Sequence, residues 1–358
     1  MADSHRVPAS GHLPQSSGTG TGDVGGPRRL GMLGTLVWDR IHHPHLPSDP
    51  QEGWGGLSYS LEAVSSVLSK GWLACPILRL GSDLADDALD YLSSIPGTVT
   101  DPGVEVVQDP NPRVELRYRD ADRRTERLQG LLPPWTWSDL EPVLADLDAL
   151  YVNFITGLEL ELETALDLST RLSIPLYADL HSLFLGRTGE GVGFPRALPS
   201  QEGWLRAFDA LQMNEAELLR LATGPGTDPW ELSEALVVGG TRIVAVTRGS
   251  RGAACVAATD GPQDPEAWPQ ERGPVPRGKD PIRKDRPASG EPPSRGDPTG
   301  CGDVWGATFF ARLLEGDSLE PAMEIANRQA ALKVEHRGAR GLGRHLRLRG
   351  GSRPPPPR

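Results

Sequence analysis

Patterns typical of strands and of helices alternate along this chain from residue 32 to residue 334. Short apolar runs of strand length lie at 32–38, 73–80, 149–155, 174–178, 210–213 and 242–247. Apolar residues with helical spacing lie at 57–70, 84–94, 160–172, 215–222, 229–238, 304–314 and 318–334. Alternation at this pitch is typical of βαβ units. We therefore expect an α/β fold with a mostly parallel sheet and helices on both faces.

The charge and the cysteines exclude several classes of protein. The net charge is −11, from 37 basic and 48 acidic side chains, so no cationic excess is available for binding nucleic acid. No run of about 18 apolar residues occurs, so we expect no membrane partner. Three cysteines without CxxC spacing, together with a first segment that lacks the apolar core of a signal peptide, favour a cytoplasmic protein.

Composition also sets the domain boundaries. Residues 1–29 and 350–358 are rich in Gly, Ser and Pro and are predicted to be disordered tails, which leaves one domain at 30–349. Within it, residues 260–296 hold nine prolines and fourteen charged residues and no apolar run of strand length. Such a segment buries too little apolar surface to offset its ordering entropy, so we predict a flexible insertion without strands.

A glycine turn with flanking aspartates indicates chemistry. Gly300, Cys301 and Gly302 lie between Asp297 and Asp303, and a helical pattern follows at once. Backbone amides that converge at a helix N-terminus form an anion site. A carboxylate on its rim repels phosphate but suits a base for a hydroxyl that attacks phosphate. The turn thus predicts phosphoryl transfer to an alcohol; a glycine-rich turn with an acidic N-cap is the alternative.

Residues 297–303 resemble the C-terminal signature of the ribokinase-like (PfkB) carbohydrate kinases, Asp-Thr-x-Gly-Ala/Cys-Gly-Asp. The resemblance extends from about residue 30 to about residue 342, because further family motifs follow in the family's order. These are Asp39 after the first strand, Gly55-Gly56, the turn at 78–83, Asn214 with Glu217, and Thr247 with Gly249 and Gly252. The resemblance implies a three-layer sandwich with a small β lid, which we place near 104–129; a solvated hairpin there is the alternative.

The resemblance also implies ATP-dependent phosphorylation of a hydroxyl on a sugar-like small molecule. Asp303 would be the base, and Gly300, Cys301 and Gly302 would stabilise the transferring phosphoryl group. Asn214 and Glu217 would organise Mg²⁺ through water, and Asp297 and Thr299 match a K⁺ site, although Pro298 replaces the usual threonine. Thr247, Gly249, Gly252 and Asn327 would face the nucleotide; for Asn327 a surface position is the alternative.

On the acceptor side, the resemblance places Asp39, Gly55, Gly56, Ser60, Asn153 and Asp179. Ser60 and His181 stand where the family commonly has asparagine, so the acceptor is not named from the commonest members. A nucleoside kinase and a non-catalytic sugar- or nucleotide-sensing protein are the alternatives on this fold. A homodimer is one arrangement open to such a chain.

Overall fold

The computed structural model describes residues 26–43, 50–119, 124–222, 224, 226–258, 264–273, 280–290 and 296–350. Most of the two expected tails, at 1–25 and 351–358, lies outside these residues. The domain boundaries expected at 30 and 349 differ slightly, because β1 (Arg28–Leu33) begins at Arg28 and α10 (Leu342–Gly350) ends at Gly350. No pattern at 342–350 had indicated that helix.

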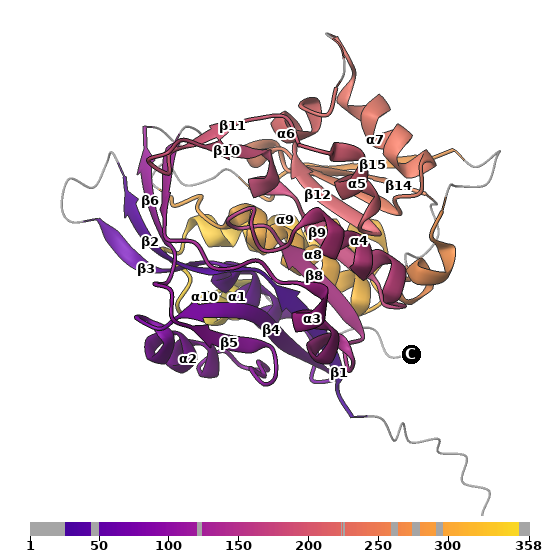
Figure 1. The fold of residues 1–358 in the computed structure, drawn as a ribbon. Coiled ribbons are helices and arrows are strands. Elements are labelled where there is room, and N and C mark those ends of the chain that lie inside the picture. Colours follow the sequence, from indigo (N-terminus) through magenta and orange to yellow (C-terminus); the bar gives the residue numbers. More distant parts are fainter. Residues whose placement is uncertain are drawn as a thin grey trace, which may run out of the picture.

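A nine-stranded sheet forms the middle layer (Figure 1). From edge to edge its strands are β15 (Ile282–Arg286), β14 (Ala253–Ala257), β13 (Ile243–Thr247), β12 (Ala210–Asn214), β9 (Leu176–Asp179), β8 (Ala149–Asn153), β1, β4 (Trp72–Gly81) and β5 (Val104–Val107). All neighbours pair in parallel except β13 with β14 and β14 with β15. The parallel strands therefore present their carboxyl ends at one edge.

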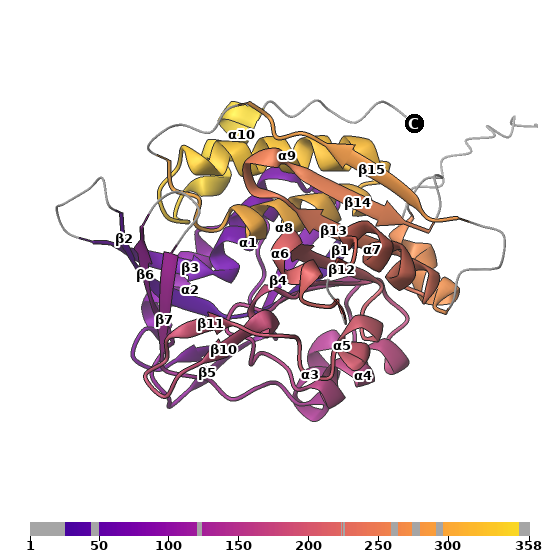
Figure 2. The ribbon, with the colours of Figure 1, turned by 90° about the horizontal axis from the view of Figure 1, so that it is seen from above.

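Helices cover both faces of this sheet, as Figure 2 shows for α9 and α10 on one side and α3, α4 and α5 on the other. The first face carries α1 (Leu57–Val67), α2 (Ala85–Ser93), α8 (Cys301–Leu314), α9 (Leu319–Val334) and α10. The second carries α3 (Trp137–Leu144), α4 (Leu162–Arg171), α5 (Gln201–Arg206), α6 (Glu215–Leu219) and α7 (Pro229–Val238). Buried strands supply both cores, with Met32 facing the first and Leu33 the second. The expected three-layer α/β fold is confirmed.

A second sheet stands beside the carboxyl ends of the large sheet (Figure 1). This lid sheet has the order β3 (Gln51–Gly56), β2 (Leu36–His42), β6 (Arg113–Tyr118) and β7 (Arg124–Gln129). The single strand expected at 32–38 is wrong, because the chain leaves the large sheet at Gly34–Thr35 and continues as β2. The hairpin expected across 104–129 is also wrong in extent. β5 pairs with β4, and only β6 and β7 form the hairpin.

A small antiparallel sheet consists of β10 (Leu185–Arg187) and β11 (Gly193–Pro195). Short 3-10 helices lie at η1 (His181–Phe184), η2 (Gly249–Arg251) and η3 (Pro265–Glu271). The absence of strands predicted for 260–296 is wrong, since β15 pairs with β14. An edge strand needs no continuous apolar run, and the exposed positions of β15 are charged. Trp268 of η3 supplies the missing apolar anchor; it is buried and stacks on Phe310 at 6.0 Å.

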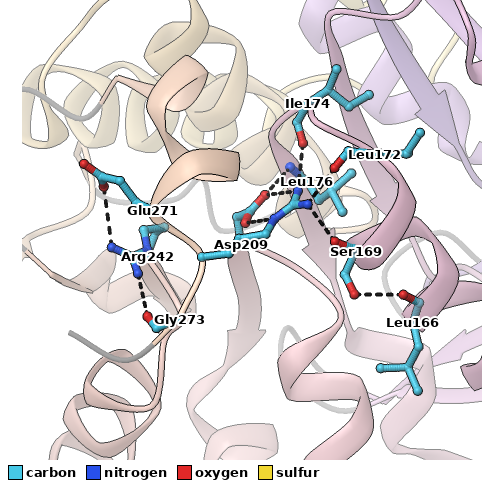
Figure 3. Close-up of polar contacts among 10 residues, drawn as sticks. Leu166, Ser169, Leu172, Ile174, Leu176, Asp209, Arg242, Glu271 and Gly273 are labelled. Atoms are coloured by element: carbon cyan, nitrogen blue, oxygen red, sulfur yellow. Dashed lines mark hydrogen bonds and ion pairs between the residues drawn. The ribbon is translucent and has the colours of Figure 1, made fainter. Parts of the chain in front are cut away.

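Arg272 connects the same segment to the second face through Asp209 and three backbone carbonyls, and Figure 3 labels these partners. Its guanidinium forms a bidentate pair with the buried Asp209 at 2.8 and 2.9 Å. It also donates to the backbone carbonyls of Ser169, Leu172 and Ile174, at the carboxyl end of α4 and just beyond it, at 2.7, 2.7 and 2.9 Å. The described part of 260–296 is therefore integrated into the fold.

Candidate active site

Four polar side chains end neighbouring parallel strands at one edge of the sheet. Asn153 ends β8, Asp179 ends β9, Asn214 ends β12 and Thr247 ends β13. The register pairs Asn153 with Asp179 and Asn214 with Thr247, and it pairs Asp179 with Gln212, two residues before Asn214, so the four side chains lie at the carboxyl ends of neighbouring strands. Ligands of open α/β sheets bind outside the carboxyl ends of the strands, which makes this edge the place for a site.

A cavity of ≈ 300 Å³ opens at this edge, between the large sheet, the lid sheet and the N-terminus of α8. Its lining includes most of the residues that the sequence predicted: Asp39, Gly56, Asn153, Asp179, Asn214, Glu217, Thr247, Gly249, Thr299, Gly300, Gly302 and Asp303. The structure thus brings both the expected acceptor residues and the expected donor residues to one cavity.

The turn before α8 requires glycine at its cap. Gly300 has φ 80°, and a Cβ there would lie 2.4 Å from Cγ of Tyr59, so both backbone conformation and space exclude a side chain. Gly300 and Gly302 line the cavity at the start of α8, whereas the Cys301 amide donates to the Pro298 carbonyl at 3.1 Å; this helix of 14 residues adds positive potential. Cys301 does not line the cavity; its Sγ lies 3.5 Å from the Ala330 carbonyl, and burial raises the pKa of its thiol to about 12. It is a protonated filler and no nucleophile.

Asp303 lies in the first turn of α8 and faces the acceptor end of the cavity. Its Oδ1 accepts a hydrogen bond of 2.7 Å from the Asn153 amide, whose nitrogen also donates to Ser60 Oγ at 3.1 Å. Burial raises the pKa of Asp303, although Asn153 and nearby cations oppose the shift. Asn153 therefore fixes one carboxylate oxygen and leaves the other for a ligand hydroxyl.

Asp39 of β2 reaches the same end of the cavity from the lid sheet. Gly55 on the neighbouring strand makes room for it, because a Cβ at Gly55 would lie 1.8 Å from Asp39 Oδ2. Gly55 itself does not line the cavity, whereas Gly56 does. Burial raises the pKa of Asp39 well above its ordinary value, with Arg124 as the main opposing charge.

Asp179 and His181 connect the acceptor end with Glu217. Asp179 accepts bonds from Gln212 at 2.7 Å and from the His181 backbone amide at 3.1 Å, and burial followed by the charge of Asp303 raises its pKa to about 7. Burial alone would lower the pKa of His181, but Glu217, 2.5 Å from its Nδ1, raises it to about 9. His181 is therefore a cation at neutral pH.

Several polar residues that line the cavity were not found from the sequence, among them Gln212, Arg124 and Glu126. Gln212 donates to Asp179 and, at 3.0 Å, to the Gly302 carbonyl, so it joins the sheet to the turn of α8. Arg124 of β7 lines the cavity and donates to the Tyr118 hydroxyl at 3.0 Å; that hydroxyl lies 2.8 Å from Thr299 Oγ1. The lone polar residue in the apolar strand 210–213 was a signal for Gln212. Arg124 carried none.

The donor end is less well matched to the predictions. Thr247 and Gly249 line the cavity and Gly252 does not. Asn327 is buried and also lies outside the lining: its Oδ1 accepts from Trp305 at 2.7 Å, and its nitrogen donates to the carbonyls of Arg286 and Pro287 at 3.3 and 2.8 Å. The structure therefore places Asn327 against the backbone that follows β15, with its amide already engaged.

The described residues fit Mg²⁺ only through water. No group of three or more His, Cys, Asp or Glu in the described part of the chain is placed to hold a metal ion. Glu217 and Asn214 form a capping box, in which Glu217 accepts from the Asn214 backbone and side chain at 2.8 and 2.5 Å. Mg²⁺ that accompanies a phosphate donor keeps several waters, and Glu217 is placed to bind one of them.

The expected K⁺ site does not fit a free cation. Asp297 faces the ammonium of Lys333, which is fully buried. The ammonium donates hydrogen bonds to the carbonyl and to the carboxylate of Asp297. Thr299 bonds Tyr118 and also donates its amide to Asp297 Oδ1 at 3.0 Å. A cation is already present at this position as a side chain.

No protein-family model and no curated protein matches this sequence. Solved structures do match. Ribokinase from Thermotoga maritima superposes with a TM-score of 0.64 at 18% identity, over 90% of this chain and 98% of that chain. A pyrophosphate-dependent kinase in the ribokinase family gives a TM-score of 0.65 at 20% identity, over 88% and 99%. Burkholderia thailandensis nucleoside kinase in complex with inosine gives 0.62 at 15%, over 90% and 98%.

The protein has the ribokinase-like (PfkB) fold, and the resemblance that the motifs indicated is confirmed at the level of the fold. At these identities the likeness extends to architecture alone. In the described part of the chain, no helix has both the length and the apolar character that crossing a membrane would require.

Proposed function

We propose that this protein is a phosphotransferase that moves a phosphoryl group from ATP to a hydroxyl of a small sugar-like molecule. The observation that carries the proposal is the position of Asp303. Its carboxylate lies in the first turn of α8, beside the amides of Gly300 and Gly302, in the cavity that Asp39 also lines. A base and an anion site that adjoin in one cavity are what transfer to an alcohol needs.

The step follows from this arrangement. The acceptor hydroxyl lies between Asp39 and Asp303, and its oxygen attacks the terminal phosphorus in line with the leaving oxygen. The hydroxyl proton passes to Asp303 as the new P–O bond forms, and the bond to the diphosphate leaving group breaks. The turn amides and Arg124 stabilise the charge on the transferring group. Glu217 would hold Mg²⁺ through a water molecule, and the ion would neutralise negative charge on the donor phosphates.

The acceptor end favours a neutral polyhydroxylated molecule. Asp39, Asp179, Asp303 and Glu126 line it, and Arg124 is its main cation. Carboxylates accept hydrogen bonds from hydroxyl groups but repel phosphate and carboxylate groups. We therefore propose sugars and cyclic polyols ahead of sugar phosphates.

Pyrophosphate is a second candidate for the donor. One structural neighbour is a pyrophosphate-dependent kinase, and another such kinase is complexed with a pyrophosphate analogue and myo-inositol. In this chain, Asn327 is engaged with the backbone after β15 and does not line the cavity. Gly300 and Gly302, which we propose to hold phosphate, line the cavity, whereas Asn327, which was expected to face the nucleotide, does not.

The test is a panel of acceptors with both donors. Sugars, cyclic polyols, sugar phosphates and nucleosides are each incubated with Mg²⁺ and either ATP or pyrophosphate, and the phosphorylated acceptor is measured by mass spectrometry. We expect phosphorylation of a neutral sugar or polyol. A nucleoside product would support the nucleoside kinase alternative, and binding without turnover would support the sensing protein.

Asp303→Asn is the control for the assignment of the base. Asparagine keeps the size of the side chain and can still cap α8, but it accepts no proton. We expect kcat to fall about 10²–10⁴-fold while acceptor affinity stays within a few-fold. Turnover near the wild-type rate would contradict the assignment.

A further inference from the structure

Lys333 is a fully buried lysine whose three N–H groups each have an oxygen partner. It lies in the last turn of α9 with a relative exposure of 0%. Its Nζ lies 3.0 Å from the carbonyl oxygen of Asp297, 3.4 Å from Oδ2 of Asp297 and 2.9 Å from the carbonyl oxygen of His336. The ring of Tyr59 lies 5.3 Å from the same nitrogen.

This environment is one that suits a monovalent cation. The groups around Nζ are two backbone carbonyls, one carboxylate oxygen and an aromatic face. All of them attract positive charge, and none of them is a hydrogen-bond donor. A protonated amine has nearly the radius of a potassium ion, so the same oxygens serve either. Lys333 lowers the pKa of Asp297 against the opposing effect of burial, as do hydrogen bonds from Thr299.

Direct contacts connect the Lys333 ammonium with the turn at 297–302. Asp297 begins the turn, and its Oδ1 accepts the amide of Thr299 at 3.0 Å. The hydroxyl of Thr299 forms a hydrogen bond with the hydroxyl of Tyr118 in the lid sheet. Tyr59 lies between Lys333 and Gly300, whose missing Cβ would strike its ring. A charge at Lys333 therefore holds the turn whose amides and base form the proposed catalytic site.

We propose that the Lys333 ammonium is a built-in monovalent cation that positions the turn at 297–302, so that this protein needs no K⁺. The expected change in turnover rests on the proposed function, whereas the expected response of Tm to cations does not. The ammonium replaces the expected K⁺ site at Asp297 and Thr299. Lys333 touches no reacting atom in the proposed step, so it is a positioning residue.

The first test uses the wild-type protein. Thermal unfolding and, where the panel yields an acceptor, turnover are measured in about 0.1 M K⁺ and in tetramethylammonium at equal ionic strength. We expect the same Tm in both salts and rates within about twofold, because no ion can add to an occupied cage. A Tm raised specifically by K⁺, or K⁺ activation of about tenfold or more, would overturn the proposal.

The second test removes the charge. Lys333→Met keeps most of the apolar stem and removes the ammonium from the buried Asp297, while His43 Nε2 stays 3.7 Å from Asp297 Oδ1. We expect Tm to fall by about 5 °C or more and turnover by about 10–100-fold. K⁺ and NH₄⁺, but not tetramethylammonium, should restore part of both losses, since a small cation can enter the emptied cage. Lys70→Met, exposed in the turn after α1, is the matched control and should show neither the loss nor the rescue.

Rescue distinguishes the proposal from a purely structural ion pair. If Lys333→Met loses stability but responds to no monovalent cation, Lys333 is structural only and the proposal is wrong. If Lys333→Met does not fold, Lys333→Gln serves in its place, because its amide can still donate to the two carbonyls. If no acceptor is turned over at all, the proposed function fails while the Tm measurements still decide the role of Lys333.

Discussion

Three carboxylates share the acceptor end of the cavity and affect one another's protonation. Burial raises the pKa of Asp39, Asp179 and Asp303, and the charge of Asp303 adds to the shifts of Asp39 and Asp179. Hydroxyl groups of an acceptor would relieve this, because they donate hydrogen bonds to the charged forms. Burial and mutual repulsion therefore destabilise the ionised carboxylates in the empty site, and hydrogen bonds from a ligand would stabilise them.

We predict that Asp179→Asn moves the acid limb of the kcat/KM profile to lower pH. A base works only when deprotonated, so activity should rise with pH as the carboxyls ionise. Burial and the charge of the ionised Asp303 raise the pKa of Asp179 to about 7, so replacing Asp179 removes that ionisation from the acid limb. The measurement is the pH dependence of kcat/KM in both proteins, and an unmoved limb would contradict the coupling.

Unfolding gives an independent check of the same coupling. A carboxyl whose pKa is raised by folding adds stability at low pH, and that stability is lost as pH rises through its folded value. The ligand-free wild type should therefore lose stability between about pH 4 and pH 7, and Asp179→Asn should lose less. Asp90→Asn, on the exposed side of α2, should behave as the wild type does.

At the scale of elements, the proline-rich segment behaves as part of the core. Trp268 packs against α8 through Phe310, β15 extends the large sheet, and Arg272 bridges Asp209 to the end of α4. The guanidinium satisfies carbonyls that the last turn of a helix leaves without partners. Replacing 260–296 by a short linker should therefore destabilise the fold.

We predict that Arg272→Met lowers the free energy of unfolding by about 3–5 kcal/mol, because it leaves the carboxylate of Asp209 buried without its partner. Urea unfolding followed by circular dichroism measures it. Arg206→Met is the matched control: its pair with Glu202 is exposed on both sides and should contribute about 0–1 kcal/mol. Equal losses of free energy of unfolding in the two variants would show that the buried Arg272 pair contributes no more stability than an exposed pair.

At the scale of the whole molecule, the site lies between two sheets that come from separate parts of the chain. The lid sheet packs on its own small cluster, which includes Ile41, Val114 and Leu128. It is joined to the turn of α8 through Tyr118 and Thr299. A ligand in the cavity touches both bodies, so its binding should couple them.

We predict that acceptor binding slows amide hydrogen exchange in β6 and β7 but not in β5. β6 and β7 belong to the lid sheet, whereas β5 is an edge strand of the large sheet and serves as an internal control. Mass spectrometry of peptic peptides from protein with and without saturating acceptor resolves these strands. Equal exchange in β6 and β7 with and without acceptor would contradict closure; slowing in β5 as well would indicate global stabilisation.

Features that depend on neighbouring residues could be predicted from the sequence. Periodicity predicted the order of the buried strands and their helices, and Gly300, Gly302 and Asp303 indicated the anion site because a turn and a helix start are local structures. Boundaries were less accurate where tertiary pairing decides them, as at Gly34–Thr35, where the chain passes from one sheet to the other. β15 was missed because edge strands lack an apolar signature.

Which distant side chains meet depends on how the whole chain packs. Arg124 is one of many arginines in the sequence, and it enters the cavity because β7 pairs with β6 beside it. Lys333 shares the buried face of α9 with Ala322 and Ala326, which was a readable signal, but its partner Asp297 lies 36 residues away. A buried charge is stable only beside its counter-charge, and that proximity comes from packing the whole chain.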